Sequence, residues 1–241
     1  MTLFSFEVPI VHLKDFSSYQ DFHLCLSHLC RQSKPYLNFY KEKVNESLKA
    51  VWLDNGYNEN MKADSAYTLV KIAQMLHPHL IICPDSPKWP VSKIQAAFDR
   101  MVSLTSRAAL QSILMVVVRD EKMMSYMQCH GVTKFAVSGR ARTNFSSLGW
   151  TKGLHYLGVN TITELKDYFP ISVDTSLPIK LALKGMTIRK FHESGLPCVH
   201  YERATGQVQK KKEYFNLHLS DKILELAISN IMALKKVCDN S

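Results

Sequence analysis

The sequence lacks the short motifs that identify several large classes of protein. No G-x-G-x-x-G follows an apolar run, so a dinucleotide-binding sheet has no support. The six cysteines form no C-x-x-C pair, and the ten histidines form no H-x-x-x-H on a helix face. We therefore expect reduced, mostly buried thiols rather than disulfides.

Long apolar segments are also missing. The longest apolar runs are far too short to span a bilayer, and the N-terminal residues lack the basic region and cleavage site of a signal peptide. No stretch is long, polar and repetitive, and no linker rich in proline, glycine or serine divides the chain. We expect a cytoplasmic protein with no membrane partner, folded as one domain over residues 1–241.

The chain does contain enough apolar sequence for a large core, together with an excess of positive charge. Hydrophobic residues make up 46% of the 241 residues, which suits a single α/β barrel. The formal net charge is +9, and residues 121–241 hold 17 Lys and Arg against 10 Asp and Glu. A nucleic-acid backbone is one partner that this charge allows, and a soluble surface that is merely basic is equally consistent with it.

Short apolar runs alternate with longer segments of helical period. The runs predicted as strands are Val8–Val11, Leu48–Leu53, Leu80–Cys83, Ile113–Val118, Lys134–Val137, Leu154–Leu157, Ile171–Val173 and Val199–Tyr201. The segments predicted as helices are Tyr19–Arg31, Ala63–Leu76, Ser92–Leu110, Glu121–Cys129, Thr161–Tyr168, Leu177–Lys184 and Ser220–Val237. Such alternation predicts a parallel sheet, and we expect a (β/α)8 TIM-like barrel rather than an open doubly wound sheet.

Carboxylates directly follow three of the predicted strands. Asp54, Asp85 and Asp174 each stand at the end of an apolar run, where a barrel carries its chemistry. One such Asp is commonly the N-cap of the next helix, but three on one rim favour a site. Convergent carboxylates suit attack at an anomeric carbon with a covalent glycosyl intermediate, and they equally suit oxygen ligation of a divalent metal ion.

Three ordered segments resemble the tRNA-guanine transglycosylase superfamily. W-L-D-N-G-Y-N-E at Trp52–Glu59 is similar to the family's D-S-G-G-F-Q or D-N-G-A-F-E element, and H-L-I-I-C-P-D-S at His79–Ser86 is similar to the strand that follows it. L-H-Y-L-G-V-N-T-I-T-E-L-K-D-Y-F-P-I-S-V-D-T-S-L-P at Leu154–Pro178 resembles the late-barrel element of the DpdA family. DpdA proteins are phage and bacterial relatives that place 7-deazaguanines into DNA. The resemblance covers roughly residues 50–190.

The resemblance implies a role for each matching residue. Asp174 would attack C1′ of the target nucleoside, Asp54 would handle a proton or contact the base, and Asp85 would accept N–H bonds from the Watson–Crick edge of guanine. The remaining residues implied to contact the base or shape its floor are Asn55, Gly56, Ser138 and Gly139. The implied reaction exchanges guanine in DNA for a free 7-deazaguanine such as 7-cyano-7-deazaguanine, without a metal or redox cofactor.

Two departures from the family pattern bear on the substrate. V-V-R-D replaces the family's V-Q-G element, which places Arg119 where a base-contacting Gln would stand. The tRNA enzymes carry a zinc site of three cysteines and a histidine. In the C-terminal part of this chain, Cys198 is the only cysteine close to a histidine, His200. We therefore predict no metal site and favour DNA over tRNA. A phage protein of this kind would work in the host cytoplasm.

Basic residues near the predicted rim are candidates for binding phosphate. They are Arg140, Arg142, Lys210, Lys211 and Lys212. A solvated loop is the competing interpretation for each. Three other functions stay open at this point: a tRNA-specific enzyme, a non-catalytic nucleic-acid-binding accessory subunit, and a hydrolase in which the three aspartates hold a metal ion. A homodimer or a larger modification complex also stays open.

Overall fold

The computed structural model describes residues 2–46, 48–57, 61–139, 141, 144–145, 153–159, 161–162, 165, 170–194 and 214–239. These residues form two compact units. The first combines Met1–Asp21 with Ser147–Ser241, and the second is Phe22–Ser146.

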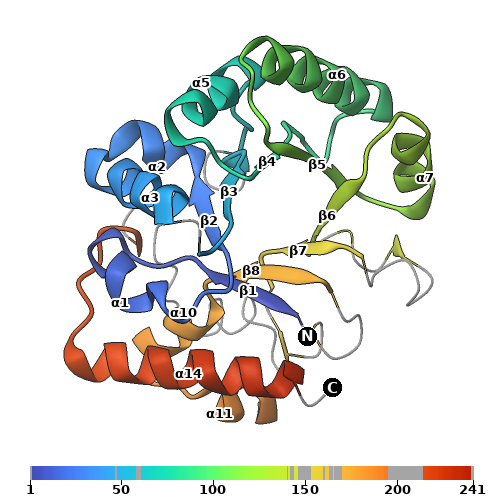
Figure 1. Ribbon diagram of the computed structural model, residues 1–241. Helices are drawn as coiled ribbons and strands as arrows, with labels where there is room; N and C mark the ends of the chain where they lie inside the picture. Colours follow the sequence, from blue (N-terminus) through green and yellow to red (C-terminus); the bar gives the residue numbers. More distant parts are fainter. Residues whose placement is uncertain are drawn as a thin grey trace. The chain divides into compact units, whose positions relative to one another are not determined.

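The second unit contains five parallel strands with helices between them. The strands are β2 (His23–Leu26), β3 (Val51–Asp54), β4 (Leu80–Ile82), β5 (Ile113–Val118) and β6 (Lys134–Ser138), paired in that order. The helices are α2 (Ser27–Gln32), α3 (Lys34–Glu46), α5 (Ala66–Leu76), α6 (Val91–Arg107) and α7 (Glu121–Cys129). Figure 1 shows these helices together on one side of their strands. Because consecutive strands are parallel neighbours, their carboxyl ends lie along one edge.

Apolar periodicity explains these elements. Val116, Val117 and Val118 are all buried, so β5 is covered on both faces, as its unbroken apolar run predicts. On α5, Leu69, Ile72 and Leu76 recur at helical spacing and are no more than 1% exposed.

The first unit contains three parallel strands, β1 (Leu3–Phe6), β8 (Ser172–Thr175) and β7 (His155–Leu157), paired in the order β1-β8-β7. Its helices are η1 (Ile10–His12), α1 (Leu13–Ser17), α10 (Leu177–Leu183), α11 (Ile188–Glu193) and α14 (Asp221–Asp239). The long helix α14 runs beside α10 and α11 (Figure 1).

A buried asparagine joins these three helices. Asn230 of α14 accepts a hydrogen bond from Ile188 N at 2.9 Å and donates to the carbonyls of Pro178 and Met186 at 3.1 and 3.0 Å. Its Oδ1 thereby satisfies the Ile188 N–H at the start of α11, one of the donors that a helix leaves without an intrahelical partner at its N-terminus.

The α/β class and the TIM-like (β/α)8 barrel predicted from the alternation are confirmed. Most predicted elements have counterparts within a few residues. The strand predicted over Ile113–Val118 and the helix over Glu121–Cys129 match β5 and α7 to the residue. The last of the predicted strands, Val199–Tyr201, lies outside the described residues, as does most of the helix predicted over Thr161–Tyr168.

Two predictions in the N-terminal part are wrong. The first strand is Leu3–Phe6 rather than Val8–Val11, a segment in which Pro9 has no N–H to donate to a strand partner and Ile10 begins the short η1 helix. Tyr19–Arg31 is not one helix, since it contains β2 and the start of α2. The run F-H-L-C-L satisfies helical spacing, but all of it is buried, as in a strand covered on both faces.

Within the described residues, no helix is both long enough and apolar enough to cross a membrane.

Candidate functional site

Polar side chains gather at the carboxyl edge of the sheet in the second unit. Asp54 ends β3, Asp85 stands three residues after β4, and Arg119 follows β5 directly. Ser138 ends β6, and Gly139 comes next. The parallel pairing of these strands brings their ends to one edge, which is where α/β barrels carry their chemistry.

Asn55 and Asp85 contact each other directly, although 30 residues separate them. Asn55 is 2% exposed, and its Nδ2 donates to Asp85 Oδ1 at 2.7 Å and to the Cys83 carbonyl at 2.8 Å. Its Oδ1 accepts from Tyr57 N at 3.0 Å. Both N–H groups of the amide are therefore used, and they fix the Asp85 carboxylate and the backbone after β4.

Asp85 is an unusual carboxylate. Burial raises its pKa from 3.8 to about 6, although the hydrogen bond from Asn55 and the charge of Arg119 oppose that rise. Among the described residues, Asp85 Oδ2 has no hydrogen-bond partner. One oxygen of this carboxylate is thus held in place, and the other is available to accept a hydrogen bond from a ligand.

Arg119 acts on this carboxylate through its charge and on the neighbouring loop through a hydrogen bond. Its Nη1 donates to the Pro87 carbonyl at 2.7 Å, and its own carbonyl accepts from Asn144 Nδ2 at 3.0 Å. The guanidinium is therefore tied to the loop that carries Asp85. The predicted contact with a base stays a prediction.

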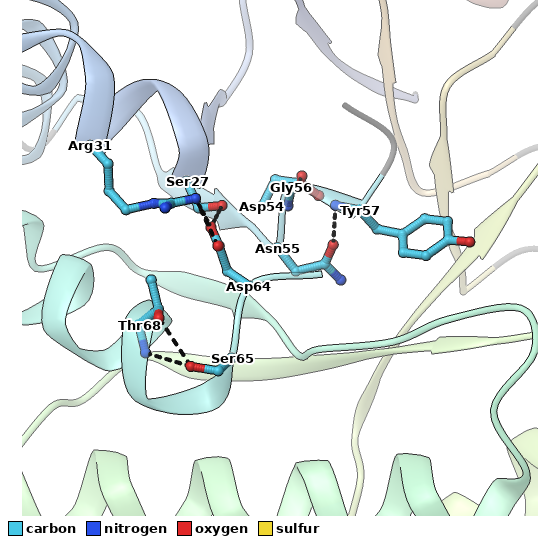
Figure 2. A network of polar contacts seen from close by, with 9 residues as sticks. All are labelled: Ser27, Arg31, Asp54, Asn55, Gly56, Tyr57, Asp64, Ser65 and Thr68. Carbon is cyan, nitrogen blue, oxygen red and sulfur yellow. Dashed lines mark hydrogen bonds and ion pairs between the residues drawn. The ribbon is translucent and has the colours of Figure 1, made fainter. Parts of the chain in front are cut away.

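The loop after β3 is held by a second polar network, which Figure 2 shows. Gly56 N donates to Asp54 Oδ2 at 2.7 Å, and Asp64 N donates to the Asn55 carbonyl at 2.8 Å. Gly56 has a φ of 74°, in the left-handed region where a side chain is strained. This tight turn places Asp54 and Asn55 side by side at the end of the strand.

Asp64 anchors that loop to α2. Ser27 Oγ donates to Asp64 Oδ2 at 2.6 Å, and Arg31 Nη2 donates to Asp64 Oδ1 at 2.8 Å (Figure 2). Asp64 lies at the start of the helix predicted over Ala63–Leu76, but it does not cap α5; the N-cap is Ser65, whose Oγ accepts from Thr68 N at 3.2 Å. Because these partners are far apart in sequence, spacing alone gave no indication of the cluster.

One carboxylate on the same edge is structural. Asp120 is the N-cap of α7, and its Oδ1 accepts from Met123 N at 2.8 Å. The helix-cap interpretation considered for carboxylates after strands therefore applies to Asp120, whereas the side chains of Asp54 and Asp85 make other contacts.

Asp174 lies in the first unit, within β8 rather than after it. Its side chain is buried, with the residue 3% exposed. Gly158 N donates to Oδ2 at 3.2 Å, and His155 Nε2 lies 3.2 Å from Oδ1. The Val159 N–H also donates to the Asp174 carbonyl at 3.1 Å, which holds the turn after β7 beside the carboxylate.

His155 and Ser172 were not among the predicted site residues. His155 is fully buried, and its Nδ1 lies 3.0 Å from Ser172 Oγ. The sequence signal was available: a histidine within the strand L-H-Y-L and a serine two residues before Asp174. Nothing in spacing alone, however, shows that β7 and β8 pair with His155 opposite Ser172.

The other predicted residues have simpler positions. Ser138 accepts a backbone hydrogen bond from Ala141 N at 2.9 Å, and nothing in the structure tests the base contact proposed for it or for Gly139. The basic residues predicted to bind phosphate lie outside the described residues; they are Arg140, Arg142, Lys210, Lys211 and Lys212. Cys198 and His200 lie outside them as well.

No cluster of three or more His, Cys, Asp or Glu side chains in the described part of the chain could hold a metal ion. The cysteines described there, Cys25, Cys30, Cys83 and Cys129, are free thiols.

No protein-family model matches the sequence, and no curated protein sequence matches it either. Solved structures do match the fold. N-acetylneuraminate lyase from Fusobacterium nucleatum aligns with a TM-score of 0.53 at 10% identity, covering 97% of each chain. Oxaloacetate acetylhydrolase, solved with 3,3-difluorooxalacetate, aligns with a TM-score of 0.51 at 7% identity, covering 98% of this chain and 91% of that chain. At these identities the likeness is one of fold alone.

Proposed function

We propose that this chain is a barrel enzyme that exchanges guanine in DNA for a 7-deazaguanine base through a covalent intermediate on Asp174. The observation that carries the proposal is the Asp85 carboxylate, which has one oxygen fixed by Asn55 and the other without a partner in the described residues. Guanine and 7-deazaguanines both present an N1–H and an exocyclic amine, and a carboxylate can accept from both.

The state of Asp85 supports a binding role rather than a structural one. A carboxylate whose pKa is raised to about 6 by burial costs folding free energy at neutral pH. Such a cost at the chemical edge of a barrel is expected where a ligand is later bound, since the incoming N–H donors compensate the desolvated charge.

Each half of the reaction balances in atoms and electrons. An oxygen of the Asp174 carboxylate forms a bond to C1′ while the C1′–N9 bond breaks, and guanine leaves with the electron pair and takes up a proton. N9 of the incoming base then bonds to C1′, the ester C–O bond breaks, and the N9 proton is released. Asp54 is the proposed proton carrier, in line with the resemblance of its segment to the family's D-N-G element.

The coarser proposal that this chain is an enzyme has separate support. The two solved structures compared above are both enzymes by name, a lyase and a hydrolase, which favours catalysis over simple binding for this fold. The net charge of +9 suits a polyanionic substrate. Because C1′ of a paired nucleotide is inaccessible, the enzyme would flip the nucleotide out or act on single strands.

The test is release of labelled guanine from double-stranded DNA in the presence of excess 7-cyano-7-deazaguanine, with the same label in tRNA as a second arm. We expect wild type to release label from DNA, and Asp174→Asn and Asp85→Asn not to. Asp120→Asn is the matched control, because it removes a carboxylate from the same edge while an asparagine still caps α7.

Each other outcome has its own meaning. Release from tRNA alone would keep the chemistry and replace the substrate. Release from neither polymer, by a protein that still binds DNA, would contradict catalysis and leave an accessory, nucleic-acid-binding role as the better account. Equal loss in Asp120→Asn and Asp85→Asn would remove the specific role given to Asp85.

A further inference from the structure

One face of the β1-β8-β7 sheet carries four buried polar side chains. In parallel strands, residues in register point to the same side, and Ser5 pairs with Asp174 while His155 pairs with Ser172. Ser172 and Asp174 are two residues apart, so all four side chains share one face. All four are buried, at no more than 3% exposure.

The opposite face is mainly apolar, although it also carries Thr175, whose Oγ1 donates to the Val159 carbonyl at 2.7 Å. Phe4 and Phe6 stack with ring centroids 5.9 Å apart, and Val173 lies in register with Phe4. Buried polar groups are costly unless they are paired, so a face that collects four of them indicates a functional surface rather than a packing surface.

His155 connects two of these polar groups. Its Nδ1 lies 3.0 Å from Ser172 Oγ, and its Nε2 lies 3.2 Å from Asp174 Oδ1. The second pair is within ion-pair distance but does not meet the geometry of a hydrogen bond. Contacts of this kind commonly tighten only when substrate binds.

Ser172 and Asp174 together determine how the His155 ring is oriented and which of its nitrogens carries the proton. A serine hydroxyl that donates to Nδ1 leaves the proton on Nε2, and this N–H then faces the carboxylate. In the alternative tautomer, a bare Nε2 lone pair would face a lone pair of the carboxyl oxygen, and this arrangement is repulsive. Ser172 therefore sets the imidazole so that it presents a donor to Asp174, and the backbone N–H of Gly158 holds the other oxygen.

We propose that His155, oriented by Ser172, is a positioning residue for Asp174, holding its carboxylate in a single rotamer as an acceptor aimed for attack on C1′. This inference rests on the proposed transglycosylase function. His155 forms no bond to the substrate and carries no proton in the exchange. It acts by holding the nucleophile in one position, since small misplacements of a reacting group are expensive in rate.

The experiment measures, in a single turnover, the formation of a denaturant-stable adduct between protein and DNA. His155→Asn keeps an amide near the Nδ1 position but is too short to reach Asp174, and His155→Gln extends an amide to the Nε2 position. We expect His155→Asn to slow adduct formation on the order of 100-fold with little change in the affinity for DNA. His155→Gln is expected to recover most of that loss.

Ser172→Ala supplies a milder variant that leaves the ring in place. We expect it to slow adduct formation by about tenfold at unchanged DNA affinity, which is the scale of one lost neutral hydrogen bond. Ser176→Ala is the matched control, because Ser176 lies in the same chain segment and its side chain makes no capping hydrogen bond to α10. It should react as wild type does.

The outcomes separate the two proposals. A wild type that forms no adduct with DNA or tRNA overturns the proposed function and this inference with it. An active wild type whose rate is unaffected by His155→Asn and Ser172→Ala overturns only the positioning role. A loss shared equally by His155→Asn and His155→Gln, in parallel with a fall in melting temperature, would make His155 a packing residue and would also overturn it.

Discussion

Replacement of Asp85 by asparagine should make the protein more stable at neutral pH. Burial raises the pKa of this carboxyl from 3.8 to about 6, and that rise corresponds to roughly 3 kcal/mol of unfolding free energy lost when the group is ionised. Asparagine carries no charge to desolvate, and it keeps an oxygen that can accept from Asn55. Part of the gain is offset, because the hydrogen bond from Asn55 to a neutral acceptor is weaker. A net gain of about 1–2 kcal/mol follows.

The sign of the pH dependence is fixed by the direction of the pKa shift. A carboxyl whose pKa is raised in the folded state does not weaken folding below about pH 4, where it is protonated in both states. Its destabilising effect grows between about pH 4 and pH 6, where the carboxyl is ionised in the unfolded state and protonated in the folded state, and is constant at higher pH. The gain from Asp85→Asn should therefore be near zero at pH 4 and fully developed at pH 8.

Urea unfolding of wild type and Asp85→Asn at several pH values measures this directly. The matched control is Asp99→Asn, which removes an exposed carboxylate from α6 and should have little effect at any pH. A variant that is less stable than wild type at pH 8, or a gain that does not change between pH 4 and pH 8, would refute the reasoning that burial dominates at Asp85.

Three further predictions follow from the same edge of the second unit. Free 7-deazaguanine should bind about tenfold more weakly at pH 5 than at pH 7.5, because the carboxylate of Asp85 becomes protonated as the pH falls through about 6. Calorimetry measures this affinity, and Asp85→Asn should abolish its pH dependence. Gly56→Ala should lower the free energy of unfolding, measured in urea, by about 1–2 kcal/mol, because φ at this position is 74°. Gly153→Ala should lower it little, because the added Cβ would lie in open space. Asp64→Asn should cost about 1–2 kcal/mol by weakening the contacts with Ser27 and Arg31, and Arg31→Gln should cost less, because Arg31 is 44% exposed; equal losses would contradict the role given to Ser27.

The sequence predicts the elements best where local pattern and tertiary environment agree. β5 is an unbroken apolar run and α7 has an N-cap aspartate with apolar residues at helical spacing, so both were predicted to the residue. Prediction fails where one apolar run is compatible with both a helix and a buried strand. The apolar run at residues 22–26 fits a helix as well as a fully buried strand, and only its pairing with β3 decides for the strand.

The candidate site divides in the same way. The positions of Asp54 and Asp85 at strand ends could be predicted from sequence, because a polar residue after an apolar run is visible locally. The contact of Asn55 with Asp85, and the anchoring of the loop by Asp64, join residues about 30 or more positions apart and depend on which strands and helices are neighbours.

By itself the sequence determined the α/β class, the alternation of strands and helices, and the presence of three carboxylates at or near strand ends, because these follow from local periodicity and composition. Tertiary structure alone decided that burial raises the pKa of Asp85 and that His155 faces Asp174. Both are consequences of strand pairing and its register, which local patterns do not encode.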